Sequence, residues 1–106
     1  MLKFLERLLF GADRGQVKSA IEAGALLVDV RTPSEYASGH VKGSMNIPLE
    51  SIPKNLSKFK NREPIVVFCR SGARSAQAKV LLNQSGFQHV INGGSWSSVN
   101  KLVSNN

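Results

Sequence analysis

The sequence predicts an α/β fold in which a central parallel sheet is covered by helices on both faces. Two observations carry this prediction. Strand-like and helix-like stretches alternate along the chain, which is the order that a parallel sheet requires. The run 65–68 is apolar and mostly β-branched, as expected for a buried strand. At 106 residues and 42% hydrophobic, the chain can form one domain with a modest core.

The chain begins with an amphipathic pattern. Residues 1–12 carry apolar side chains at helical spacing, with Glu6 and Arg7 between them, and we expect a helix that precedes a domain over 13–103. It could dock on a membrane surface or a partner, but we expect it to pack on its own domain or on a second copy. The apolar run is too short for a membrane span, which needs about 20 residues, and charges interrupt it as a secretory signal. We therefore expect a cytoplasmic protein.

The next two helices have recognisable ends. Asp13 can cap a helix that stops at Gly24, and a buried strand follows over 26–30. The stretch Thr32-Pro33-Ser34-Glu35 offers a capping residue, proline at the first helical position and glutamate at the third, so we predict a short helix that ends at Gly39. We expect His40, in the turn beyond it, to be a hydrogen-bonded structural residue and not a catalytic base.

The second half repeats this alternation. We predict a brief strand at 44–47, a polar connection over 52–62 with one helical turn, the strand at 65–68 and a helix over 74–84. That helix is expected to direct Ala76, Val80 and Leu81 inward. After a short strand at 90–91 we expect a turn at Gly93-Gly94 and a final segment whose Trp96 packs on the core.

The only cysteine, Cys69, directly follows the central strand and starts a loop that runs into a helix, and we call residues 69–74 the cysteine loop. A loop of this kind presents backbone N–H groups that have no helical acceptor, which makes it an anion-binding site. These N–H groups, together with Arg70 and Arg74, favour the thiolate form of Cys69. The alternative is a small buried hydrophobe, but such a residue requires neither arginine. We therefore predict that Cys69 is a nucleophile.

Asp29 and Arg31 lie at the end of the other central strand. Because parallel strands end at the same edge of a sheet, we expect these residues to lie near Cys69. Asp29 is expected to accept hydrogen bonds from the loop backbone or from an arginine. One cysteine cannot form an internal disulfide or a cysteine-rich zinc site, so we expect a free thiol, no metal and no cofactor.

Four segments, in this order and spacing, resemble the motifs of single-domain rhodaneses, which are sulfurtransferases. They are Leu27-Val28-Asp29-Val30-Arg31; Glu35 to Ser44 with Asn46-Ile47-Pro48; Cys69 to Ser75; and Gly93-Gly94 with Trp96. The resemblance covers 17–96. It implies that Cys69 takes a sulfur atom from thiosulfate or a persulfide donor, holds it as a persulfide, and passes it to a thiol or cyanide acceptor.

The same resemblance assigns the other site residues. Donor binding falls to Arg70, Ser71, Gly72, Ala73 and Arg74, with supporting roles for Asp29, Arg31 and Ser75. Arg74 either binds donor oxygens or braces the loop. The expected partners are a small anionic sulfur donor and a thiol acceptor or thioredoxin-like reductant.

Other functions stay open. A rhodanese-like module can act as a binding domain or sulfur carrier without turnover. A cysteine phosphatase or arsenate reductase would use a similar loop, although the stretch between Cys69 and Arg74 is one residue shorter than in cysteine phosphatases. A net charge of +7 suits anionic ligands or an acidic partner, and we expect no specific nucleic-acid binding because no such motif is present.

Overall fold

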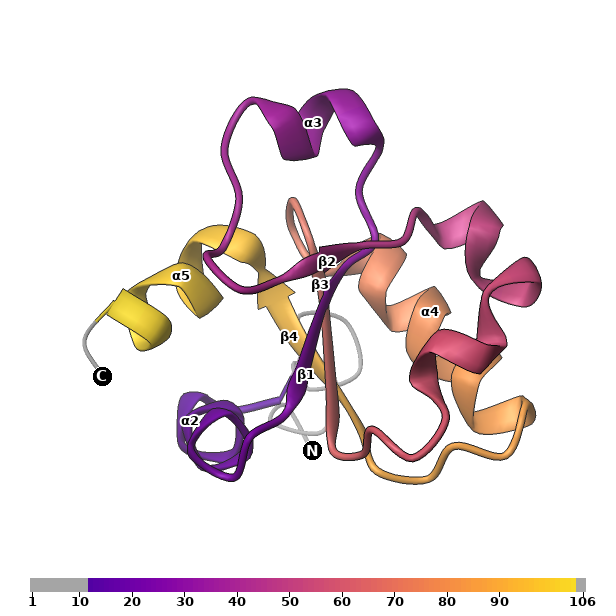
Figure 1. The fold of residues 1–106 in the computed structure, drawn as a ribbon. Coiled ribbons are helices and arrows are strands. Elements are labelled where there is room, and N and C mark those ends of the chain that lie inside the picture. Colours follow the sequence, from indigo (N-terminus) through magenta and orange to yellow (C-terminus); the bar gives the residue numbers. More distant parts are fainter. Residues whose placement is uncertain (1–11, 105–106) are drawn as a thin grey trace.

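The computed structural model describes residues 12–104, and it has a four-stranded parallel sheet with the strand order β2-β1-β3-β4 (Figure 1). The strands are β1 (Leu26–Asp29), β2 (Met45–Asn46), β3 (Ile65–Cys69) and β4 (Val90–Ser95). The helix predicted over 1–12 falls on residues outside the described range, apart from Ala12.

Helices cover both faces of the sheet, so the predicted fold class is confirmed. They are α2 (Arg14–Glu22), α3 (Pro33–Ala37), α4 (Ala73–Gln84) and α5 (Trp96–Ser104), with 3-10 turns η1 (Leu49–Lys54) and η2 (Leu56–Phe59). In Figure 1, α2 and α5 lie on one side of the sheet and α4 lies on the other, while α3 stands beyond the strand ends.

The central strand β3 is buried on both faces, and its side chains alternate between two apolar clusters. Val66 and Phe68 pack with residues of α2 and α5. Val67 and Cys69 pack with residues of α4 and of the turns η1 and η2. This alternation places the cysteine on the α4 face, so the helix that follows the cysteine loop also covers its sulfur.

Two helix starts follow the predicted capping. The Asp13 carboxylate accepts a hydrogen bond from the Gln16 N–H at 2.9 Å. At α3, the Thr32 hydroxyl accepts from the Glu35 N–H, and the Glu35 carboxylate accepts from the Thr32 N–H, which forms the full capping box.

The predicted inward face of α4 was wrong at Val80, whose side chain is 54% exposed. The buried positions are instead Ser75, Ala78 and Leu82. The phase of the helix is set at its first turn, where Ser75 faces Cys69, and the spacing of three and four residues then brings 78 and 82 onto the sheet. Small side chains on this face allow α4 to lie close to the strands.

The turn predicted at Gly93-Gly94 was also wrong, since both glycines lie within β4. The register between β3 and β4 shifts there: Val67 is opposite Asn92 and Phe68 is opposite Gly94. A Cβ atom at Gly93 would lie 2.9 Å from both Val66 and Val99. The glycine is therefore required by close packing and not by a change of chain direction.

Within residues 12–104, no helix combines the length and the apolar character that crossing a membrane would demand.

Candidate active site

The carboxyl ends of β1 and β3 lie side by side, because Asp29 is the register partner of Phe68. Cys69, the last residue of β3, therefore lies next to the end of β1. This convergence was predicted from the strand order, and the structure confirms it.

Cys69 is buried, with 1% of the residue exposed. Gly72 adopts a left-handed backbone conformation with φ of 108°, which glycine tolerates without strain. In this conformation the Gly72 N–H donates a hydrogen bond to the sulfur over 3.0 Å. The Ser75 hydroxyl oxygen, on the first turn of α4, lies 3.5 Å from the same sulfur.

These contacts decide the ionisation of Cys69. Burial acts to raise the pKa of the thiol, but hydrogen bonds from the Ser75 hydroxyl and from the N–H groups of Ser75, Gly72 and Ser71 outweigh it. The pKa of Cys69 is therefore below its ordinary value. A thiol in this environment forms the nucleophilic thiolate more readily than an isolated cysteine does.

A buried asparagine, which the sequence did not reveal as a site residue, completes this network. The Asn92 side chain is 3% exposed, and its Oδ1 accepts from the Ser75 hydroxyl at 2.7 Å and from the Gly94 N–H at 3.0 Å. Its Nδ2 donates to the Gly72 carbonyl over 3.2 Å. The one signal in the sequence was an amide in the middle of a buried strand, where a partner is required.

Arg74, predicted either to bind the donor or to brace the loop, forms a two-pronged ion pair with Glu35 of α3. Its Nη1 and Nη2 donate to the two carboxylate oxygens over 2.7 and 3.0 Å. Hydrogen bonds from Arg74, and next from the Thr32 N–H, lower the pKa of Glu35 to about 2. The pair ties α3 to the start of α4, and Glu35 is a second residue that the sequence did not reveal as part of the site.

The remaining loop residues line the rim. Arg70, Ser71 and Ala73 are exposed, whereas Gly72 is buried. Within the described part of the chain, the Arg70 guanidinium makes neither an ion pair nor a side-chain hydrogen bond. Its charge is therefore available to an anion that approaches the loop.

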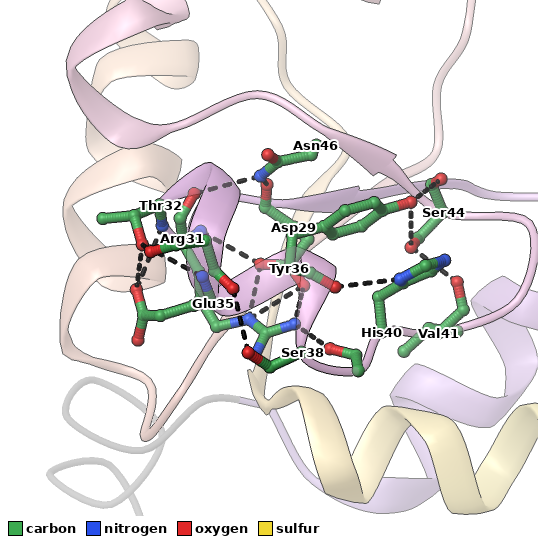
Figure 2. A network of polar contacts seen from close by, with 12 residues as sticks. Asp29, Arg31, Thr32, Glu35, Tyr36, Ser38, His40, Val41, Ser44 and Asn46 are labelled. Atoms are coloured by element: carbon green, nitrogen blue, oxygen red, sulfur yellow. Dashed lines mark hydrogen bonds and ion pairs between the residues drawn. The ribbon is translucent and has the colours of Figure 1, made fainter.

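Asp29 and Arg31 form a buried ion pair at the end of β1 (Figure 2). The Arg31 guanidinium donates to both oxygens of Asp29 over 2.7 to 2.9 Å, and its backbone N–H donates to the same carboxylate at 3.0 Å. Arg31 also donates to the Gly39 carbonyl at 2.7 Å and lies 4.6 Å from the Trp96 ring centre. The prediction that Asp29 accepts from an arginine is confirmed.

This cluster joins β1, the turn after α3 and the start of α5. In the 12–104 range, no side-chain hydrogen bond links Asp29 or Arg31 to the cysteine loop. Its role in positioning the loop stays a prediction.

His40 is hydrogen-bonded, as predicted. Its ring stacks on Tyr36 with centroids 3.9 Å apart, and its Nδ1 lies 2.9 Å from the Tyr36 carbonyl (Figure 2). The Tyr36 hydroxyl in turn donates to the Ser44 carbonyl over 2.7 Å. Nowhere in the described residues do three or more histidine, cysteine or acidic side chains gather as they would around a metal ion.

The fold and the loop define a class: an α/β protein that holds one buried cysteine among hydrogen-bond donors at the carboxyl end of a parallel sheet. The chain belongs to the rhodanese-like domain family, whose model matches residues 13–101. The resemblance read from the sequence motifs is thereby confirmed.

Several relatives are named as sulfurtransferases. The chain is 43% identical to a sulfurtransferase of Allochromatium vinosum over 67 residues, which are 63% of this chain and 63% of that protein. It is 36% identical to thiosulfate sulfurtransferase GlpE of Pseudomonas aeruginosa over 88 residues, 79% of this chain and 80% of that one. The matched stretch spans less than two thirds of the first relative, and most of the second.

A solved structure agrees with these matches. A rhodanese from E. coli, determined with anions, superposes with a TM-score of 0.65 and is 33% identical. The superposition covers 70% of this chain and 89% of that one.

Proposed function

We propose that this chain is a rhodanese-type sulfurtransferase that carries sulfur as a Cys69 persulfide. The observation that carries the proposal is the convergence of the Gly72 N–H and the Ser75 hydroxyl on one buried sulfur, at 3.0 and 3.5 Å. Donors arranged in this way stabilise negative charge on sulfur, both before attack and in the persulfide. The sulfurtransferase relatives support the same reaction class.

In the first step, a lone pair of the Cys69 thiolate forms a bond to the outer sulfur of thiosulfate. The sulfur–sulfur bond of thiosulfate breaks, and its electron pair leaves with sulfite. The product is a Cys69 persulfide that bears one negative charge. In the second step, an acceptor thiolate or cyanide attacks the outer sulfur, and the electron pair of the persulfide bond returns to Cys69.

The two loop arginines divide the work in this proposal. Arg70 stands exposed at the rim and binds the oxygens of the incoming anion, since a guanidinium can contact two oxygens at once. Arg74 is occupied by Glu35 and braces the loop. A phosphatase mechanism needs an arginine that grips the phosphoryl group, so this ion pair favours the sulfurtransferase over a phosphatase or arsenate reductase.

The acceptor is a small thiol or a thioredoxin-like reductant. Cys69 is the only cysteine, so no second thiol of this chain can resolve the persulfide. The free thiol and the thiol acceptor both suit a reducing compartment such as the cytoplasm.

The test is intact mass spectrometry of the protein after incubation with thiosulfate under anaerobic conditions. We expect one added sulfur atom that survives buffer exchange and disappears when a thioredoxin system is added. Cys69→Ser should gain no sulfur and should lose essentially all thiosulfate turnover, with a circular dichroism spectrum like that of the unmodified protein.

Absence of the adduct and of turnover would support a module that binds without reacting. Hydrolysis of aryl phosphates that depends on Cys69, without sulfur transfer, would support the phosphatase reading instead.

A further inference from the structure

We propose that Asn92 is a positioning residue for Cys69, which acts by holding the two groups that donate hydrogen bonds to the sulfur. The inference rests on the proposed function for its catalytic meaning. The contacts that carry it do not involve the substrate: Asn92 touches Ser75, Gly72 and Gly94, and Ser75 and Gly72 touch Cys69.

The orientation of the Asn92 amide is determined by its neighbours. Its Oδ1 faces two donors, the Ser75 hydroxyl and the Gly94 N–H, whereas its Nδ2 faces the carbonyl of Gly72. Exchanging the two ends would set an NH₂ group against an N–H and an oxygen against an oxygen. The amide therefore bridges β4 to the cysteine loop in one orientation.

The bond to Gly72 fixes the turn that aims a donor at the sulfur. The Gly72 carbonyl accepts from the Ala76 N–H at 3.0 Å, which begins α4, and from the Asn92 side chain. The N–H of the same residue points to Cys69. Because Gly72 is in the left-handed region, where glycine has wide freedom, anchoring its carbonyl restricts a position that is otherwise easily moved.

The Ser75 hydroxyl, which lies between Asn92 and Cys69, can direct its proton toward either of them. The oxygen lies 2.7 Å from Asn92 Oδ1, 3.1 Å from the Gly72 carbonyl and 3.5 Å from the sulfur, but the group has a single proton. When Cys69 is a thiol, its S–H donates to the Ser75 oxygen, and the Ser75 O–H donates to Asn92. When Cys69 is ionised, the O–H turns to the sulfur.

Asn92 suits this exchange because its Oδ1 keeps a second donor. After the Ser75 proton turns away, the Gly94 N–H still donates to that oxygen, so no buried acceptor is left without a partner. The register shift in β4 brings Gly94 opposite Phe68, and its N–H bonds the Asn92 side chain. The register shift in β4 therefore supplies the second donor that the buried Asn92 amide needs.

The test is the pKa of the Cys69 thiol, measured as the pH dependence of its alkylation by iodoacetamide. Asn92→Ala should raise this pKa, because the Gly72 turn that aims an N–H at the sulfur loses its side-chain anchor, and this should outweigh the loss of Asn92 Oδ1 as a competing acceptor of the Ser75 proton. Loss of that one hydrogen bond to a charged group corresponds to a rise of about one pH unit. At a pH below the pKa, alkylation should then slow by about tenfold, and kcat/KM for thiosulfate should fall by a similar factor.

A matched control is Asn46→Ala. Asn46 also bonds backbone carbonyls with its side-chain amide, to Asp29 and Arg31 at 3.0 Å each, but it does not touch the residues that donate to the sulfur. Both variants should lower the melting temperature, and only Asn92→Ala should change the thiol pKa. An unchanged or lowered pKa in folded Asn92→Ala would overturn the proposal.

Ser75→Ala supplies the second arm. It should raise the thiol pKa, and the rise caused by Asn92→Ala should persist when it is combined with Ser75→Ala, because the bond from Asn92 to the Gly72 carbonyl does not depend on Ser75. If Asn92→Ala does not fold, an unchanged pKa in Ser75→Ala is by itself sufficient to reject the proposal. Alkylation requires no sulfur donor, so a pKa that follows Asn92 in a protein without turnover would refute the proposed function and leave this inference standing.

Discussion

The adjacent ends of β1 and β3 each bury an ionisable side chain, but the polar groups around the two side chains are arranged differently. β1 ends at Asp29, whose charge is neutralised by Arg31 in a cluster that also uses Gly39 and Trp96. β3 ends at Cys69, where the surrounding donors converge on one atom and Arg70 is exposed on the rim. The polar groups at the end of β1 are paired with one another. Those at the end of β3 are arranged to stabilise the negative charge that Cys69 acquires when it ionises.

The difference shows that burial and charge alone do not identify a reactive site. Asp29 and Cys69 are both buried at the same edge of the sheet. The carboxylate is saturated by its partners and joins three segments of the fold. The hydrogen bonds donated to the Cys69 sulfur are strongest when the thiol is ionised. What distinguishes the two ends is whether hydrogen-bonding capacity is matched in the resting state.

Removing the charge at the end of β1 should have the largest effect on stability. Asp29→Ala leaves the Arg31 guanidinium buried without its counter-charge, which typically costs about 3–5 kcal/mol. Chemical denaturation should detect the loss as a lower midpoint. In the protein that remains folded, we expect the thiol pKa to change less than in Ser75→Ala. A stable Asp29→Ala protein with a strongly altered thiol pKa would reverse the comparison.

Arg70→Ala tests the end of β3, where the Arg70 side chain is exposed. Loss of hydrogen bonds from a charged donor to the incoming anion should reduce kcat/KM for thiosulfate by about tenfold to a hundredfold. Because Arg70 is exposed, the free energy of unfolding should change by less than about 0.5 kcal/mol. Arg62→Ala, which removes the same charge before the opposite end of β3, is the control and should leave donor kinetics unchanged. A large fall in melting temperature with normal kinetics would make Arg70 structural.

The smallest effect concerns the partly exposed pair that links α3 to α4. Glu35→Gln keeps an acceptor for the Thr32 N–H but removes the charge that faces Arg74, and should cost about 0.5–1 kcal/mol at neutral pH. The folded-state pKa of Glu35 is lowered to about 2, so its contribution to stability is present above the unfolded pKa of about 4.3 and is lost as the pH falls through about 2.

The melting temperature of the unmodified protein should therefore fall more steeply than that of Glu35→Gln over this acidic window. Glu50→Gln, at an exposed carboxylate in η1, should retain the steep profile. Parallel profiles for the native protein and Glu35→Gln would mean that the ion pair adds no stability.

The sequence predicted the parts of this protein that depend on local rules. The alternation of elements, the capping of α3 by Thr32 and Glu35, and the placement of Cys69 at a strand end followed by a helix all appear in the structure. Each depends on residues close together in the chain, or on the general geometry of parallel sheets.

What the sequence did not predict depends on contacts between distant segments. The pairing of Glu35 with Arg74 joins residues 39 positions apart, and Asn92 meets Ser75 only because β4 lies beside β3. Val80 was misplaced because the buried face of α4 runs through Ser75, Ala78 and Leu82, a phase that begins where Ser75 meets Cys69. The glycines of β4 resemble a turn in sequence, yet at Gly93 the requirement is space between β3 and α5.

Trp96, which packs against Arg31 at the end of β1, has a spectroscopic consequence. The chain contains one tryptophan and one cysteine. A single indole fluorophore therefore lies at the end of β1, and a single thiol lies at the end of β3. Tryptophan emission and labelling of the thiol, both followed during one denaturant titration, therefore report on two neighbouring places without an introduced fluorophore. Coinciding curves mean that both ends unfold as one cooperative unit, and labelling that precedes the change in emission means that the cysteine loop opens while the sheet is intact.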